Sequence, residues 1–429
     1  MTDTYKDMIF ERIKPWLVRI SLFVFMIILV WGCGRVPRVD ESPMPFSRLP
    51  FVRILLDDAS RQHRFISGGG QMAIDCYKGD DRYSYYSRQS VIVKSEGRKL
   101  ALFTGSGTTL DYDIDRIVIS PRGKNQVLGY DKKQYRGLFE LTSISGQIKL
   151  VNIVYMEDYL LGVVPLEIGP TPDSMVESVK AQAVAARTYA MSHLDQYGVE
   201  AGYDLKADII DQVYGGLSVE IKKFRNAIMA TKGQVAVYND EMIDAYYHST
   251  CGGTTDDIED VWDKDPRPYL KMISDGDACG ISKYHSWEES FTADQLVLRL
   301  EQYLSRERGN DIRVGRLIDI RIPNRTPGGR TAAVTFETTN GRYTFNKEKV
   351  RWVIGRTDNS EGILRSANFT LDIRKNNQGE IEKVVFRGRG YGHGVGMCQM
   401  GAKGLAAEGI TYDSILSLYY QGTEIKSLY

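Results

Sequence analysis

The chain has 429 residues, of which 42% are hydrophobic and 26% are charged, as in an ordinary globular protein. This length allows two or three domains of average size, or one elaborated domain. Lysine plus arginine and aspartate plus glutamate each number 55, so the formal net charge is zero. That balance argues against a strongly basic surface for nucleic acid or for a polybasic membrane contact.

Residues 1–32 are predicted to be an export signal. Basic side chains precede an apolar run of about a dozen residues, Ile20 to Trp31, and they are Lys6, Arg12, Lys14 and Arg19. A basic stretch followed by a short apolar run is typical of a secretory signal. The run is shorter than the roughly 20 apolar residues that a membrane-spanning helix needs.

Cys33 follows this run, and the sequence Val30-Trp31-Gly32-Cys33 resembles a bacterial lipobox. In this interpretation the signal is cut off before Cys33, acyl chains on Cys33 anchor the protein to a membrane, and the proline-rich residues 33–49 form a tether of low order. An uncleaved signal anchor and a plain secretory signal are the alternatives. All three predict export to a compartment where disulfides can form. The lipoprotein interpretation places the protein in the cell envelope, anchored outside the cytoplasmic membrane.

Residues 50–150 are predicted to be a strand-rich lead-in to a larger domain at 151–429. In this part β-branched residues alternate or cluster in short segments, with glycine and polar turns between them. The predicted strands are 51–56, 91–95, 115–120, 137–143 and 148–155.

The next segment, Thr171 to Leu194, predicts a long helix. Pro172 suits the first helical position, and Ser174 with Glu177 has the spacing of a capping box. Alanine and valine occupy every face of this helix, which is typical of a central, buried helix. Glu167 is then expected in the strand-to-helix loop that precedes it.

The rest of the chain is predicted to mix short helices and strands. A hairpin is expected to turn at Asn239-Asp240 within residues 233–250. The other expected elements are helices at 221–230, 292–307, 400–409 and 411–422 and strands at 312–322, 331–338 and 342–345.

Glu167 is an isolated carboxylate in the apolar stretch Val163 to Ile168. Desolvation disfavours the ionised form and raises the pKa of a carboxyl group. A raised pKa suits a general acid that protonates a poor leaving group such as a glycosidic oxygen. The alternative is a glutamate at a strand end whose side chain simply faces solvent.

The stretch Gly390 to Gly404 is a glycine-rich loop that leads into a short helix. Glycines alternate with other residues from Gly388 to Gly396, which lets the backbone turn sharply and approach a ligand. His393 lies between two of these glycines, where it could bind a sugar or tune a carboxylate. The alternative is a solvated loop histidine.

Two cysteines and two histidines form a further candidate site. Cys251 and Cys279 could form a disulfide in an oxidising compartment. With His248 and His285 they make a Cys₂His₂ set that could hold a tetrahedral zinc ion. Free thiols are the third alternative, and the sequence leaves all three open.

Several of these stretches together resemble the stage II sporulation protein D family, whose members include amidase enhancers. The matching blocks occur in the family's order, and they are residues 159–169, 179–190, 211–216, 246–255, 390–409 and 415–425. The resemblance covers most of residues 150–429.

The resemblance implies a lytic transglycosylase that cleaves the β-1,4 bond between N-acetylmuramic acid and N-acetylglucosamine in peptidoglycan. The family's catalytic glutamate falls on Glu167. Hydrolytic glycosidases usually need two carboxylates. A lytic transglycosylase can use one, because the attacking 6-hydroxyl belongs to the substrate. Glycan strands without stem peptides are implied as the preferred substrate.

The resemblance also implies an α+β fold, with a sheet-rich domain built around the alanine-rich helix and a glycan-binding groove over Glu167. Five matching positions are expected to line that groove: Arg187, Tyr189, Ser249, His393 and Gln399. No cofactor is required for this reaction, and a structural zinc ion stays open because some family members bind zinc near the block matched by 246–255.

The expected partners are peptidoglycan strands, a membrane through the N-terminal lipid or signal anchor, and a cell-wall amidase, with no nucleic acid. The main alternative function is a non-catalytic glycan-binding module that enhances an amidase. A structural envelope lipoprotein without affinity for glycans is a second alternative.

Overall fold

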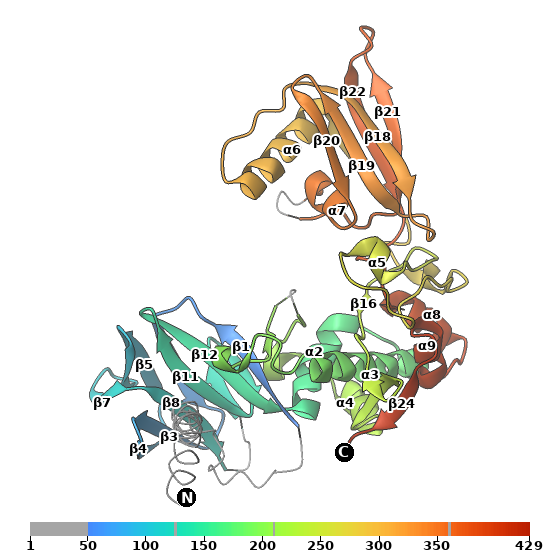
Figure 1. The fold of residues 1–429 in the computed structure, drawn as a ribbon. Helices are drawn as coiled ribbons and strands as arrows, with labels where there is room; N and C mark the ends of the chain where they lie inside the picture. The colour runs from blue at the N-terminus through green and yellow to red at the C-terminus, as the bar shows by residue number, and fades with distance from the viewer. Residues whose placement is uncertain (1–49, 124–126, 209–210, 359–361) are drawn as a thin grey trace, which may run out of the picture. The chain divides into compact units, whose positions relative to one another are not determined.

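The computed structural model describes residues 50–123, 127–208, 211–358 and 362–429, and it confirms a mixed α+β fold (Figure 1). The predicted signal, the tether and Cys33 lie outside the described residues. None of the described helices is both long enough and apolar enough to span a membrane.

The first part of the described chain is built from strands, as predicted. Seven strands of one sheet follow the order β13-β1-β12-β11-β8-β3-β4, and six of another follow β10-β9-β2-β5-β6-β7. Their bounds are β1 Phe51–Asp57, β2 Gln62–Ser67, β3 Gln71–Lys78, β4 Asp81–Ser87, β5 Val91–Glu96, β6 Lys99–Thr104, β7 Thr109–Ile114, β8 Arg116–Arg122, β9 Val127–Tyr130, β10 Lys133–Arg136, β11 Leu138–Ile144, β12 Gln147–Tyr155 and β13 Leu205–Lys206.

The segment before the alanine-rich helix is itself a helix, α2 (Met156–Ile168). The prediction of a loop around Glu167 was therefore wrong, because Glu167 lies in this helix. A short apolar run fits a buried strand and a buried helix equally well, and its periodicity does not separate them. Here the helix is apolar over most of its length and largely buried. Pro165 is tolerated in the last turn, and Gly169 ends the helix with φ 68° while its N–H donates to the Pro165 carbonyl.

The alanine-rich helix is confirmed as α3 (Val176–Ser192), although it starts later than predicted. A short 3₁₀ turn, η1 (Asp173–Met175), precedes it, and no side-chain cap forms at Ser174. Glu177 instead accepts the backbone N–H of Tyr412.

Helix α3 separates two hydrophobic cores, which explains why all of its faces are apolar. One face, with Val179, Ala183 and Ala186, packs into the core shared with the two large sheets. The other face, with Ala181 and Val184, packs into a second core that holds the C-terminal helices.

The elements around α3 come from two parts of the chain, residues 199–248 and residues 397–427. The hairpin of β14 and β15 turns at Asn239-Asp240, where both residues have positive φ, as the sequence predicts. The bounds are η2 Val199–Ala201, η3 Gly216–Val219, α4 Lys222–Ala230, β14 Gln234–Tyr238, β15 Glu241–Met242, β16 Tyr247–His248, β23 Met397–Cys398, α8 Gln399–Ala407, α9 Tyr412–Tyr419 and β24 Glu424–Ser427.

The residues between β16 and β23 include a segment with a hydrophobic core of its own. Its strands form two three-stranded sheets, β17-β22-β21 and β18-β19-β20, and its helix α6 carries a complete capping box of Thr292 and Gln295. The bounds are α5 Ile258–Val261, η4 Ala278–Ile281, β17 Trp287–Thr292, α6 Ala293–Arg308, β18 Leu317–Arg325, β19 Thr331–Thr338, β20 Gly341–Asn346, α7 Lys349–Ile354, β21 Phe369–Lys375 and β22 Ile381–Gly388.

Candidate active site

Glu167 lies in the last turn of α2, and its carboxyl group is half-buried. Its Oε1 accepts a hydrogen bond of 3.1 Å from the backbone N–H of Val213. Burial raises the pKa of Glu167 to about 7, against the opposing hydrogen bonds from Val213 and from the side chain of Gln399. The carboxyl group can therefore hold or release a proton near neutral pH.

The segment DQVYGG, residues 211–216, holds the Val213 N–H in place. The Gly215 N–H donates to the Gly162 carbonyl at 3.0 Å, which fixes the segment to α2. Gly162 is required there, because a Cβ at this position would lie 2.5 Å from the ring of Tyr214. The sequence singled out this segment only as a matching block, and its role as a support for Glu167 depends on long-range contacts.

Gln212 of the same segment ties two tyrosines together beside Glu167. Its Oε1 accepts the hydroxyl of Tyr159, and its Nε2 donates to the hydroxyl of Tyr247, both at 2.9 Å. The charge of Glu167 acts on both phenols and helps to raise their pKa values, after the larger effect of burial. The phenols of Tyr159 and Tyr247 are thus neutral, are hydrogen-bonded to Gln212 and lie close enough to Glu167 for its charge to act on them.

Two of the matching sequence blocks meet through a short parallel strand pair. Tyr247 of β16 pairs with Met397 of β23, and His248 pairs with Cys398. The pairing places Gln399, the next residue, where its side chain reaches Glu167. The Gln399 Nε2 also donates to the Oε1 of Gln182 at 3.3 Å.

His393 is held by the backbone. Its Nε2 lies 2.9 Å from the Tyr247 carbonyl, and its Nδ1 accepts the Val395 N–H at 3.1 Å. The two contacts fit a neutral ring with the proton on Nε2. Burial lowers the pKa of His393 to about 3, so the ring is uncharged at neutral pH.

Two other predicted groove residues lie near this region. Tyr189 is largely buried and stacks on His193, with 4.0 Å between the ring centroids. Ser249 directly follows β16 and is partly exposed, and its carbonyl accepts the Met400 N–H at 2.9 Å. The groove over Glu167 stays a prediction.

Arg187 does not line an accessible surface, and its expected role in a groove is corrected. The side chain is fully buried, and it is paired with the fully buried Glu157 through Nε–Oε1 at 2.9 Å and Nη2–Oε2 at 2.6 Å. A buried charge needs such a partner, so this arginine has a structural role in the core.

The candidate Cys₂His₂ set is only half assembled. The Sγ atoms of Cys251 and Cys279 are 3.5 Å apart, a hydrogen-bond distance, and are not joined by a disulfide. His248 instead contacts the Val395 carbonyl through Nδ1, and His285 contacts Asp277 through Nε2 at 2.7 Å.

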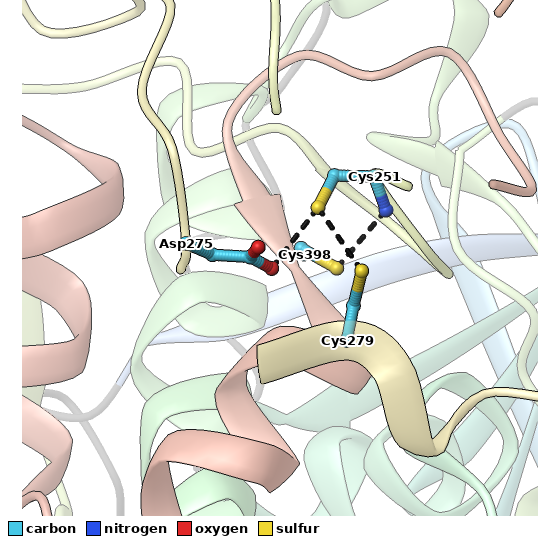
Figure 2. A group of neighbouring side chains, drawn as sticks. All are labelled: Cys251, Asp275, Cys279 and Cys398. Atoms are coloured by element: carbon cyan, nitrogen blue, oxygen red, sulfur yellow. Dashed lines mark hydrogen bonds between the residues drawn. The ribbon is translucent and has the colours of Figure 1, made fainter. Parts of the chain in front are cut away.

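Asp275 and Cys398 lie where the two histidines were expected (Figure 2). Neither residue carries a local signal for this role, because both reach the cysteine pair only through the tertiary fold.

Comparison with known proteins identifies the family. Residues 144–238 match the family described as "Stage II sporulation protein", and residues 279–396 match a domain of unknown function, DUF8618. An uncharacterized protein of Brachyspira hyodysenteriae is 31% identical over 292 residues, which cover 68% of this chain and 72% of that protein.

Two Bacillus subtilis proteins are also similar. The stage II sporulation protein D is 31% identical over 289 residues, 64% of this chain and 75% of that protein. The amidase enhancer is 30% identical over 304 residues, 62% of this chain and 40% of that protein. The resemblance seen in the sequence blocks is confirmed: the chain belongs to the stage II sporulation protein D family.

Proposed function

We propose that this protein is a peptidoglycan lytic transglycosylase, with Glu167 as its general acid and base. The observation that carries the proposal is the state of the Glu167 carboxyl group, which is half-buried and has a pKa raised to about 7. The groups that contact it, the Val213 N–H and the Gln399 side chain, orient the carboxyl group without supplying a second acid.

The proposed reaction uses one carboxyl group twice. Protonated Glu167 gives its proton to the glycosidic oxygen that leaves from C1 of N-acetylmuramic acid. The resulting carboxylate then takes the proton of the muramoyl 6-hydroxyl, whose oxygen attacks C1 and closes a 1,6-anhydro ring. Because the nucleophile belongs to the substrate, its proximity to C1 is built in.

The proposed setting is the cell envelope. A catalyst of this kind acts on peptidoglycan strands outside the cytoplasmic membrane, and a lipid on Cys33 would hold it at a membrane. The name of the amidase-enhancer relative suggests a cell-wall amidase as a functional partner.

The same relative favours a second candidate function, a non-catalytic glycan-binding module that enhances an amidase. Such a module would bind glycan strands but would not use the proton of Glu167.

Mass spectrometry of digested sacculi separates the two functions. Purified sacculi are incubated with the wild type, with Glu167→Gln and with Glu408→Gln, which changes an exposed glutamate as a matched control. We expect 1,6-anhydro-muramoyl ends from the wild type and the control, and none from Glu167→Gln. Binding without any new ends would support the amidase enhancer. Hydrated reducing ends from the wild type would mean a hydrolase and would overturn the mechanism.

A further inference from the structure

Four side chains from separate segments converge in the second core. They are Cys251, Asp275, Cys279 and Cys398, all buried, and their ligand atoms lie within 4.8 Å of one another (Figure 2). Cys251 follows β16, Asp275 and Cys279 flank the start of η4, and Cys398 ends β23. The cluster is therefore a product of the tertiary fold.

We propose that Cys251, Asp275, Cys279 and Cys398 bind one zinc ion in a tetrahedral Cys₃Asp site that stabilises the fold. Thiolate sulfurs and carboxylate oxygens are both zinc ligands, and structural zinc sites are closed by four protein ligands in tetrahedral geometry. This site is independent of the proposed catalytic function, because Glu167 contributes nothing to it.

The spacing of the ligand atoms suits a metal better than a disulfide. Sulfur atoms about 2.3 Å from a tetrahedral zinc ion lie roughly 3.8 Å from each other. The Sγ atoms of Cys251 and Cys279 are 3.5 Å apart, and Cys251 Sγ is 3.0 Å from Asp275 Oδ2. A disulfide needs about 2.05 Å between its sulfurs.

The carboxyl group of Asp275 is only partly satisfied. Its Oδ2 lies 3.0 Å from Cys251 Sγ and accepts the Tyr419 hydroxyl at 3.4 Å. Its Oδ1 is buried and makes no hydrogen bond, and among the described residues no lysine, arginine or histidine forms an ion pair with it. Buried charges are normally paired or bound to metals. A zinc ion would supply the missing positive charge.

Backbone N–H groups donate hydrogen bonds to the sulfurs of Cys251 and Cys398. The Cys251 N–H and the Gly401 N–H donate to Cys398 Sγ at 3.1 and 3.2 Å, and the Gly253 N–H donates to Cys251 Sγ at 3.3 Å. Cys398 is also the N-cap of α8, so its sulfur lies at the end of the helix where backbone N–H groups point outward. Such contacts orient ligands and offset the negative charge of a thiolate-rich site.

The positions of the ligands indicate what the metal would stabilise. Cys279 lies just before the segment with its own core, and Cys398 lies just after it. One ion would join the two points where the chain enters and leaves that segment. It would also hold Cys398 next to Gln399, whose side chain contacts Glu167.

Metal analysis of the full chain, purified in detergent without chelators, tests the site. We expect about one zinc ion per wild-type chain, and a loss of most of it in Cys398→Ser and Asp275→Asn. Two variants serve as matched controls that keep their zinc. They are Cys76→Ser, which changes a buried cysteine of β3 outside the cluster, and His285→Ala, which removes a histidine bound to Asp277.

A readout on the wild type avoids dependence on how the variants fold. We expect cobalt exchanged into the wild-type site to show the charge-transfer absorption of three thiolate ligands in tetrahedral geometry. A Cys251–Cys279 disulfide peptide in metal-free protein, identified after alkylation and digestion, would overturn the proposal. Zinc that persists in Cys398→Ser and disappears in His285→Ala would also overturn it, in favour of a Cys₂His₂ site.

Discussion

Glu157 lies in the first turn of α2 and Glu167 in its last turn, and the two glutamates have different surroundings. Glu157 is fully buried, and its carboxylate receives the Arg187 guanidinium, the Gly233 N–H at 3.1 Å and the Tyr429 hydroxyl at 2.7 Å. Glu167 is half-buried, and among the residues that the structure describes no cation contributes to its pKa. The same residue type thus pairs with a buried arginine at one end of the helix. At the other end it is the proposed proton carrier.

The difference shows how partners decide the role of a buried acid. A carboxylate with a full set of donors is fixed in one state and stabilises the fold. A carboxyl group that is desolvated but only partly satisfied keeps both protonation states within reach. The same change of glutamate to glutamine is therefore expected to reduce activity at one end of α2 and stability at the other.

The largest expected effect is that of Glu167→Gln on activity. The amide cannot give or take a proton, so we expect the rate of anhydro-muramoyl formation to fall at least about 100-fold. The free energy of unfolding at about pH 5 should change by less than about 1 kcal/mol, because wild-type Glu167 is mostly protonated there. Product release and chemical denaturation measure the two effects. Activity near the wild-type rate would remove the basis for the comparison.

The matching change at the other end, Glu157→Gln, should act on stability. It leaves the buried charge of Arg187 without its counter-ion, which typically costs about 3–5 kcal/mol. Chemical denaturation measures the loss, and Asp240→Asn, which removes one partner of an exposed ion pair with Lys426, should leave the unfolding midpoint unchanged. A small cost for Glu157→Gln would mean that this pair does not stabilise the core.

A pH series sharpens the comparison through the raised pKa of Glu167. The folded protein holds this proton up to about pH 7, whereas the unfolded chain releases it near the ordinary value of 4.5. The stability from the bound proton is complete below about 4.5 and is lost as pH rises through about 7. The free energy of unfolding of the wild type, relative to Glu167→Gln, should therefore fall by about 1–3 kcal/mol between about pH 5 and pH 8. A flat difference would show that burial does not hold the proton.

The smallest expected effect concerns Gln399. Its hydrogen bond lowers the pKa of Glu167, so Gln399→Ala should raise that pKa by less than about one unit. The activity of the wild type should decline above about pH 7, and the decline should move to higher pH in the variant. Gln378→Ala, at an exposed turn, is the control for the pH–rate profile. A shift to lower pH would contradict the contact between Gln399 and Glu167.

Local signals made some parts of this protein predictable. The strands of the lead-in and the hairpin at Asn239-Asp240 follow from side-chain alternation and turn chemistry, which act between near neighbours. The apolar faces of α3 correctly indicated a central helix. Helix α2 was missed because its apolar run carries no period, and only its packing in the core shared with the two large sheets decides its form.

In the candidate site, too, some features follow from local sequence and others depend on tertiary contacts. The sequence alone determined the family and singled out Glu167, Cys251 and Cys279 as candidates, because these depend on residue identity within short blocks. Only the tertiary structure decided that Arg187 pairs in the core, that Val213 and Gln399 hold the acid, and that Asp275 and Cys398 complete the cysteine cluster. Burial, pKa and ligand geometry arise from contacts between distant segments, and no local pattern encodes those distances.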